Sequence, residues 1–191
     1  MQREAVFQAN TIVDQFLLRY RCSRVRQFLR VHPNTQKVLD LGCGKGQLIH
    51  WLLKKNLDAY GVDLKAHGNR IIAGNLNKKI PLPDKSFDLV TSLANIEHLE
   101  KPEQNLLEIF RILKPGGYLI LTTPSLYAKP ILEFLAFKLK WIDATEILDH
   151  KRYYSKCSLH KALEQAGFTN IRMRYFQMGF NICVWAKKTE E

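Results

Sequence analysis

The stretch VLDLGCGKGQ, Val38–Gln47, decides the fold. A short apolar run ends in an acid and is followed by glycines at every second position, namely Gly42, Gly44 and Gly46. Glycine has no Cβ and tolerates positive φ, so a loop of this kind lets a ligand lie against the main chain. The helix predicted to follow, residues 47–55, would point free N–H groups at that ligand.

Short apolar runs alternate with helical segments after this loop. Strands are predicted at 37–41, 59–62, 71–73, 87–93 and 118–123, the last entered through a turn at 114–117, and helices at 47–55 and 103–113. Such alternation indicates a parallel sheet with helices on both faces and right-handed crossovers. Near the end, a helix is predicted at 158–165 and two strands, 171–176 and 181–186, turn at Gly179. That terminal hairpin would add one antiparallel strand.

Length and composition favour one intracellular domain. With 191 residues, 46% of them hydrophobic, the chain can bury a single core. It contains no apolar run of about 18 residues and no pattern typical of a signal peptide, so we expect a cytoplasmic protein. The four cysteines form no C-x-x-C pair, which predicts reduced thiols. No metal ligands are predicted.

Basic residues outnumber acidic ones, 29 to 18, which gives a net charge of +11. This charge favours a polyanion, an anionic membrane surface or an acidic small molecule as partner. Apolar residues recur at helical spacing from Glu4 to about Val31, which predicts one or two amphipathic helices. Five arginines in the second half predict one strongly positive face, which is either a solvated face whose arginines also shield the core or a binding surface: Arg19, Arg21, Arg24, Arg26 and Arg30.

An acid at the end of the second strand points to a nucleoside ligand. Asp63 ends the segment AYGVD, about twenty residues after the glycine loop, where an acid accepts hydrogen bonds from ribose hydroxyls. The spacing G-x-G-x-G nevertheless differs from the dinucleotide pattern G-x-G-x-x-G. Asp40, beside the loop, would repel a pyrophosphate and suits a cationic ligand.

Together with Gly74-Asn75, FDLVTSLANIEHL and LKPGGYL, these motifs resemble the class I S-adenosylmethionine-dependent methyltransferases, in their type 11-like small-molecule branch. The resemblance covers residues 37–125. It implies S-adenosyl-L-methionine as cofactor and a Rossmann-like α/β fold, with a seven-stranded, mostly parallel sheet in the order 3-2-1-4-5-7-6. We expect one domain with a helical extension (1–36), a cofactor-binding core (37–125), a variable lid or acceptor insert (126–157), and a terminal helix and hairpin (158–191).

The resemblance also implies roles for individual residues around the cofactor. The cofactor-binding positions are Asp40, Gly42, Cys43, Gly44, Asp63, Leu64, Asn75, Leu76 and Leu93. Asp40 would act on the amino group of the methionine part, directly or by ordering the loop, and Cys43 is then a loop residue and not a nucleophile. Asn75 would accept from the adenine amino group. For the three leucines, plain core packing is the alternative.

Candidates for the methyl acceptor side follow the fourth strand and the insert. His98 is the candidate general base, and the alternative is that His98 and Glu97 cap and order their loop. His150 and Tyr153 are candidate acceptor contacts, because family members have a similar pair at the pocket mouth. The insert carries an apolar face that includes Leu132 and Ile142, which predicts a sheet-covering helix, a lid, or an anchor in anionic membrane.

The sequence therefore predicts an enzyme that methylates a small or lipid-like acceptor, at oxygen. Ser92-Leu93-Ala94-Asn95 stands where enzymes acting on a base amine carry N-P-P-Y or D-P-P-Y. Two alternatives remain. One is an RNA or protein methyltransferase that uses the arginine-rich helix, and the other is a non-catalytic cofactor-binding partner subunit.

Overall fold

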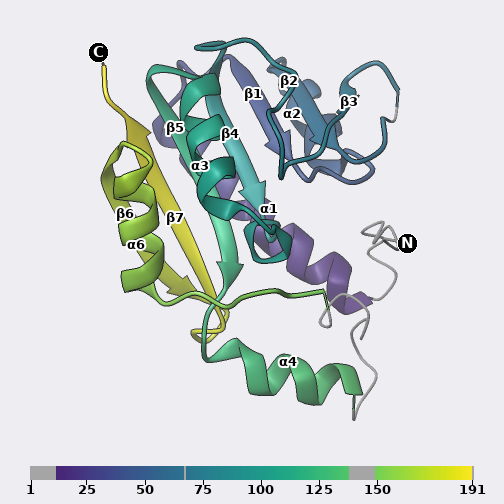
Figure 1. The fold of residues 1–191 in the computed structure, drawn as a ribbon. Coiled ribbons are helices and arrows are strands. Elements are labelled where there is room, and N and C mark those ends of the chain that lie inside the picture. The colour runs from purple at the N-terminus through teal and green to yellow at the C-terminus, as the bar shows by residue number, and fades with distance from the viewer. Residues whose placement is uncertain (1–11, 67, 138–148, 191) are drawn as a thin grey trace.

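The computed structural model describes residues 12–66, 68–137 and 149–190. Within them, seven strands form one sheet in the order β3-β2-β1-β4-β5-β7-β6 (Figure 1). The strands are β1 (Lys37–Leu41), β2 (Asp58–Asp63), β3 (Ile71–Ala73), β4 (Phe87–Leu93), β5 (Leu113–Pro124), β6 (Phe168–Phe176) and β7 (Asn181–Lys188). This confirms the predicted α/β fold class and strand order.

The pairing of the strands brings their carboxyl ends to one edge. The pairs β3-β2, β2-β1, β1-β4 and β4-β5 are parallel, whereas β7 runs antiparallel to both β5 and β6. Asp40 lies opposite Gly61 on β2 and Thr91 on β4. The loops that leave β1, β2 and β4 therefore meet at the same edge, which is where ligands bind in open α/β sheets.

Helices cover both faces of this sheet. They are α1 (Ile12–Val31), α2 (Gln47–Leu53), α3 (Pro102–Ile112) and α6 (Lys156–Gln165). Helix α4 (Ala128–Phe137) and the short 3-10 helix η1 (Ile96–His98) instead follow the carboxyl ends of β5 and β4. Successive β1 residues face opposite cores, since side chains alternate along a strand. Leu39 packs with α3 and α6, and Val38 packs with α1 and α2. All four residues of β1 after Lys37 are buried.

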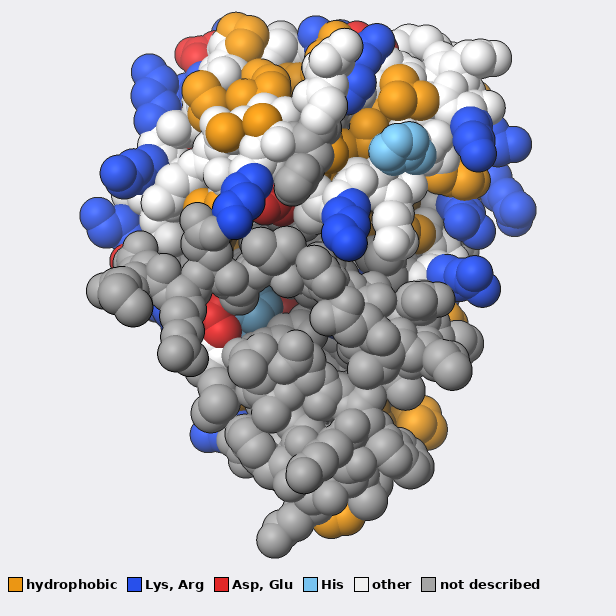
Figure 2. Space-filling model, turned by 90° about the vertical axis from the view of Figure 1, so that its right-hand side faces the viewer, with side chains coloured by type: hydrophobic (Ala, Val, Ile, Leu, Met, Phe, Trp, Pro, Cys, Tyr) orange, Lys and Arg blue, Asp and Glu red, His pale blue; other side chains and the backbone are white. Residues whose placement is uncertain are grey.

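The arginines of α1 divide between core packing and the surface, and Arg19, Arg26 and Arg30 are exposed. Arg21 is buried, whereas Arg24 lies over the Tyr20 ring and Arg26 over the Trp51 ring, each 4.9 Å from the ring centroid. Because α1 packs on α2 and on the sheet, these arginines shield the core, as the first of the two alternatives for this face expects. Lys and Arg side chains are correspondingly spread over the described part of the face seen in Figure 2.

Some predicted element boundaries were also wrong. The segment 114–117, predicted as a turn, belongs to β5, and the pairing with β4 shifts register between Phe87 and Leu89 to accommodate it. Helix α6 begins two residues earlier than predicted, because the Ser155 hydroxyl caps it by accepting a hydrogen bond from the Ser158 N–H at 3.0 Å. Element ends of this kind depend on pairing and capping partners.

The insert after β5 does not cover the sheet in its described part. Helix α4 lies beyond the carboxyl end of β5 (Figure 1), and Ile131 and Phe134 are exposed. The sheet-covering alternative is therefore wrong for this helix. The rest of the predicted apolar face, including Ile142, falls at 138–148, outside the described residues. None of the helices in the described ranges is both long and apolar enough to cross a membrane.

Candidate active site

The loop from β1 to α2 can follow its path only with glycine. Gly42, Gly44 and Gly46 have φ values of +67°, +52° and +73°, in the left-handed region that favours glycine. The Gly42 N–H donates to the Val62 carbonyl at 2.9 Å. A Cβ on Gly42 would lie 2.7 Å from Oδ1 of Asn95. The loop therefore turns at the sheet edge through three positions that carry no side chain.

Asp63 fixes this loop to the neighbouring strand. Its Oδ2 accepts a hydrogen bond from the Gly44 N–H at 2.8 Å, and its Oδ1 accepts from the Leu64 N–H at 2.8 Å. Each carboxylate oxygen keeps a second lone pair, which is what a pair of ribose hydroxyls requires. The tie between Asp63 and Gly44 is a second task that the sequence did not predict.

Asp40 lies behind the loop in a buried position. It is 5% exposed, and its Oδ1 accepts a hydrogen bond from the Thr91 hydroxyl at 2.6 Å. The pKa of Asp40 is raised to about 7, chiefly by burial. The Thr91 hydrogen bond opposes this rise, and the Asp63 charge adds a smaller increase. At neutral pH the carboxyl group is divided between its two forms, and a nearby ammonium group would favour the carboxylate.

The remaining predicted cofactor residues lie in different environments. Leu76 is buried in the core below the sheet edge, which fits its packing alternative. Leu93 is half-buried against the α1 and α2 core, and Leu64 is 56% exposed beside Asp63. An exposed leucine at this position has the surface that an adenine ring would cover.

Asn75 and Cys43 also have defined contacts. Asn75 is exposed, and its Oδ1 accepts from the Asn77 N–H at 2.9 Å, which leaves one lone pair for a ligand. The pKa of the half-buried Cys43 thiol is raised, first by burial and then by the charges of Asp40 and Asp63. A thiol with a raised pKa is a poor nucleophile, as the prediction for Cys43 requires.

The structure brings the three candidate acceptor residues together. His98 Nδ1 lies 3.1 Å from Oδ2 of Asp149, and the His98 ring centroid lies 4.8 Å from that of His150. His150 Nδ1 lies 3.2 Å from the Tyr153 hydroxyl. We call Glu97, His98, Asp149 and His150 the histidine cluster.

This cluster adjoins the glycine loop through one residue. The His98 N–H donates to the Asn95 carbonyl at 3.1 Å, and the Asn95 side chain lies against Gly42. Figure 2 shows a histidine side chain and acidic side chains together in a hollow of the face it draws. A ligand on the glycine loop and an acceptor at the cluster would therefore be neighbours.

Burial shifts the pKa of two members of the histidine cluster, Glu97 and His150. Glu97 is fully buried, and its Oε2 accepts from the Thr123 hydroxyl at 3.0 Å. Burial raises the pKa of Glu97, although the nearby charges of His98 and Arg21 lower it. Burial lowers the pKa of His150 to about 3, with smaller contributions from His98 and Arg21, so this imidazole is neutral at physiological pH.

Sequence reasoning missed four residues of this region: Arg21, Thr91, Asn95 and Asp149. Thr91 and Asn95 belong to the fourth-strand motif, and their position in it was the available signal. Asp149 directly precedes His150. Nothing in the pattern distinguished the buried Arg21 from the other arginines.

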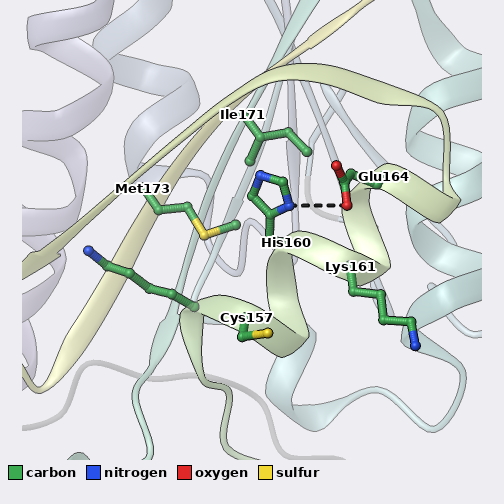
Figure 3. Close-up of a pocket in the computed structure, with 7 residues that line it drawn as sticks. Cys157, His160, Lys161, Glu164, Ile171 and Met173 are labelled. Carbon is green, nitrogen blue, oxygen red and sulfur yellow. Dashed lines mark ion pairs between the residues drawn. The ribbon is translucent and has the colours of Figure 1, made fainter.

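A separate cavity of about 500 Å³ lies between α6 and β6 (Figure 3). Its lining residues are Lys156, Cys157, His160, Lys161, Glu164, Ile171 and Met173. His160 and Glu164 form an ion pair at 3.2 Å, and the apolar side chains come from β6. The cavity contains none of the predicted site residues and lies along the outer strand of the sheet.

The fold and the glycine loop define a class of protein. A sheet of this order, with an acid at the end of β2 and a glycine-rich loop after β1, is that of class I S-adenosylmethionine-dependent methyltransferases. A methyltransferase domain profile matches residues 14–173. The chain belongs to this family, whose cofactor is S-adenosyl-L-methionine, and the contacts of Asp63 and Gly42 fit that cofactor.

Curated relatives of the chain are also named as methyltransferases. The chain is 29% identical over 153 residues to a ubiquinone biosynthesis O-methyltransferase of Psychrobacter arcticus, covering 70% of this chain and 59% of that protein. It is 29% identical over 178 residues to a demethylmenaquinone methyltransferase of Lactobacillus johnsonii, covering 74% and 71%. Two other curated relatives are matched over only 16% and 49% of their lengths.

The fold is also that of a solved structure. A SAM-dependent methyltransferase from Archaeoglobus fulgidus superposes with a TM-score of 0.69 at 19% identity, covering 87% of this chain and 92% of that one. At this identity the likeness concerns the fold alone.

Proposed function

We propose that this protein transfers a methyl group from S-adenosylmethionine to a hydroxyl of a small or lipid-like acceptor. The observation that carries the proposal is the junction at Asn95, which places the histidine cluster beside the glycine loop. Methyl transfer from a sulfonium is an in-line displacement, so the protein mainly aligns donor and acceptor and excludes water.

The cofactor's contacts follow from the loop and the two acids. Asp63 accepts from the ribose hydroxyls, and the methionine part lies along Gly42, Cys43 and Gly44. Asp40 supplies negative charge near the amino group of the methionine part, from behind the loop. Leu64 covers the adenine ring, and Asn75 accepts from its amino group.

A hydroxyl acceptor must lose its proton, and His98 beside the glycine loop is the candidate general base. Asp149 lies against Nδ1 of His98 and favours the tautomer with a basic Nε2. The reaction then breaks the sulfonium S–CH₃ bond and forms an O–CH₃ bond, with the proton on Nε2. His150 and Tyr153 contact the acceptor beside it.

Exposed apolar side chains favour a lipid-like acceptor. Leu126, Tyr127, Ile131, Phe134 and Met178 are exposed on α4, on the segment before it and on the β6–β7 turn. The chain that follows β5 and the β6–β7 turn lie at the same end of the sheet, because Pro124 at the end of β5 pairs with Asn181 at the start of β7. The two relatives named above are quinone-pathway enzymes by name, which agrees with an apolar acceptor.

The two alternatives have less support. Arg21 and Arg24 are engaged in packing, which leaves fewer arginines for an RNA surface. The pairing of His98 with Asp149 beside the glycine loop suits a general base, which a non-catalytic subunit does not require.

The test is transfer of label from methyl-labelled S-adenosylmethionine to whole-cell lipid, small-molecule and RNA fractions. We expect label in the lipid or small-molecule fraction, and none with the Asp63→Ala variant. Label in RNA would support the RNA alternative. Tight cofactor binding with no labelled fraction would support a partner subunit.

A further inference from the structure

Glu97 presents an unusual buried oxygen to the histidine cluster. Its Oε2 bonds Thr123, but its Oε1 is buried and has no hydrogen-bond partner within the part of the chain that the structure describes. A buried carboxylate oxygen without a partner costs free energy, since burial removes its water. Such an oxygen points to a ligand.

Each of the two imidazoles also has one ring nitrogen that could bind the same ligand as Glu97. Nδ1 of His98 is occupied by Asp149 and Nδ1 of His150 by the Tyr153 hydroxyl, which leaves Nε2 of each ring without a partner among the described residues. One ligand atom from each of Glu97, His98 and His150 lies within 4.8 Å of the others. Ligands at about 2.1 Å from one metal ion lie up to about 4.2 Å apart, so small side-chain movements suffice.

We propose that the histidine cluster binds a divalent transition-metal ion through Glu97 Oε1, His98 Nε2 and His150 Nε2. Two imidazoles and one carboxylate suit Zn²⁺, Fe²⁺ or Mn²⁺ better than Mg²⁺ or Ca²⁺, which prefer oxygen ligands. This set leaves coordination positions open for an acceptor oxygen.

The surroundings of these atoms favour a cation. Asp149 on Nδ1 of His98 is the carboxylate–histidine arrangement that orients a metal-bound imidazole and increases its basicity. Arg21 is close enough to affect Glu97 and His150, and its charge opposes a metal ion. The two carboxylates of Glu97 and Asp149 outnumber this one arginine.

The inference deepens the proposed function, because it gives the acceptor hydroxyl a ligand site. A hydroxyl bound to a divalent ion has a lowered pKa and releases its proton to solvent, and the resulting oxygen attacks the methyl carbon as the S–CH₃ bond breaks. In the metal-loaded protein His98 is therefore a ligand and no longer the proton acceptor. Metal binding itself does not depend on the methyl acceptor.

The experiment is direct metal binding to the full chain. The protein is stripped with a chelator and titrated with Co²⁺, a coloured probe for zinc-type sites, while mass spectrometry of the elements counts bound Zn²⁺ after dialysis. We expect about one ion per chain and a visible Co²⁺ absorption band. No stoichiometric ion, or a titration without a new band, would overturn the proposal.

Co²⁺ binding to single-residue variants tests whether the ion lies at the histidine cluster. Glu97→Gln and His150→Gln should remove stoichiometric binding, and Asp149→Asn should weaken it by about 10- to 100-fold as an outer partner does. The matched control is His160→Gln, since His160 is also a histidine paired with a carboxylate, at the cavity in Figure 3. It should bind Co²⁺ as the wild type does, and equal binding by all four variants would contradict the site.

Cofactor binding, measured on the same samples, separates this proposal from the proposed function. Variants that bind S-adenosylhomocysteine with wild-type affinity but have lost Co²⁺ are folded and support the site. A wild-type protein that binds the cofactor but no metal overturns only the metal site. A protein that binds metal but no cofactor overturns only the proposed function.

Discussion

The cofactor region and the histidine cluster lie side by side at the sheet edge but differ in the groups that form them. On one side, the cofactor region is built around the main chain of the glycine loop, which Asp63 ties to β2. On the other side, the histidine cluster consists of side chains from two segments, with His98 and Asp149 separated by 51 residues. The first half can serve one ligand shape in many relatives, whereas the second is free to vary with the acceptor.

The largest expected effect is that of replacing Asp63, the carboxylate that ties the glycine loop to β2. Asp63→Ala removes the acceptor for the Gly44 N–H and the acceptor for two ribose hydroxyls. Hydrogen bonds to charged groups are worth about 1.5–3 kcal/mol each, so cofactor affinity should fall by about 100-fold or more in calorimetry.

Asp58→Ala is the matched control for this variant. Asp58 begins the same strand and pairs with Arg70 on the surface at 2.6 Å. An exposed ion pair contributes little, and Asp58 lies at the opposite end of β2, so affinity should not change. Similar losses in both variants would mean that Asp63 acts through the strand and not through the cofactor.

The second prediction tests whether cofactor binding requires a position without a side chain at Gly42 of the glycine loop. Gly42→Ala places a methyl group 2.7 Å from Asn95 Oδ1 at a φ of +67°, and Gly179→Ala meets nothing within 4 Å at a φ of +93°. Both should lose about 1–2 kcal/mol of unfolding free energy from the left-handed backbone. Only Gly42→Ala should also weaken cofactor binding, by about tenfold or more, which equals about 1.4 kcal/mol.

Chemical denaturation and calorimetry on the two glycine variants give these quantities. Equal cofactor affinity in both variants would show that the loop tolerates side chains, and the contrast between the two halves would then be lost.

The third prediction concerns the pKa of about 7 that burial gives Asp40. From pH 6 to pH 8 its ionised fraction rises from about one-tenth to about nine-tenths, so cofactor affinity should rise by about tenfold. Thr91→Val removes a hydrogen bond that lowers this pKa and should move the rise to higher pH. A pH-independent dissociation constant would contradict the role of Asp40.

The same group affects stability with a definite sign. A folded-state pKa above the ordinary value means that the folded protein binds more protons than the unfolded chain between about pH 4 and pH 7. The contribution of Asp40 to the free energy of unfolding should therefore fall as the pH rises through this range. Asp40→Asn should remove that dependence in denaturation curves.

The smallest effect is expected at the exposed arginines of α1. Arg19, Arg26 and Arg30 are exposed, unlike Arg21, so their triple alanine variant keeps the packing of Arg21. Methyl transfer to a small acceptor should change by less than about twofold, because these charges are screened by salt. A large, salt-dependent loss with RNA as acceptor would support the RNA alternative.

The cofactor half was largely predictable because its pattern is local. The bounds of β1, β3 and β4 were predicted residue by residue, since each strand is an apolar run that stops at a loop. The position of Asp63 beside the glycine loop follows from the parallel pairing of β1 and β2.

The other half depends on long-range packing. The contact between His98 and Asp149 requires the later part of the insert to run back along η1. The Lys151 N–H holds it there by donating to the Glu97 carbonyl at 2.9 Å. The burial of Arg21 likewise depends on how α1 packs on the sheet. Neither contact has a periodic signal in the sequence, because both partners are set by tertiary structure.

The central claim is that the cofactor lies on the main chain of the glycine loop. A crystal structure with S-adenosylhomocysteine tests it most directly. The account predicts ribose hydroxyls on Asp63 and the amino acid part along Gly42–Gly44, with the sulfur directed toward His98. Density for the ligand in the cavity between α6 and β6, or anywhere away from Asp63, would contradict the account.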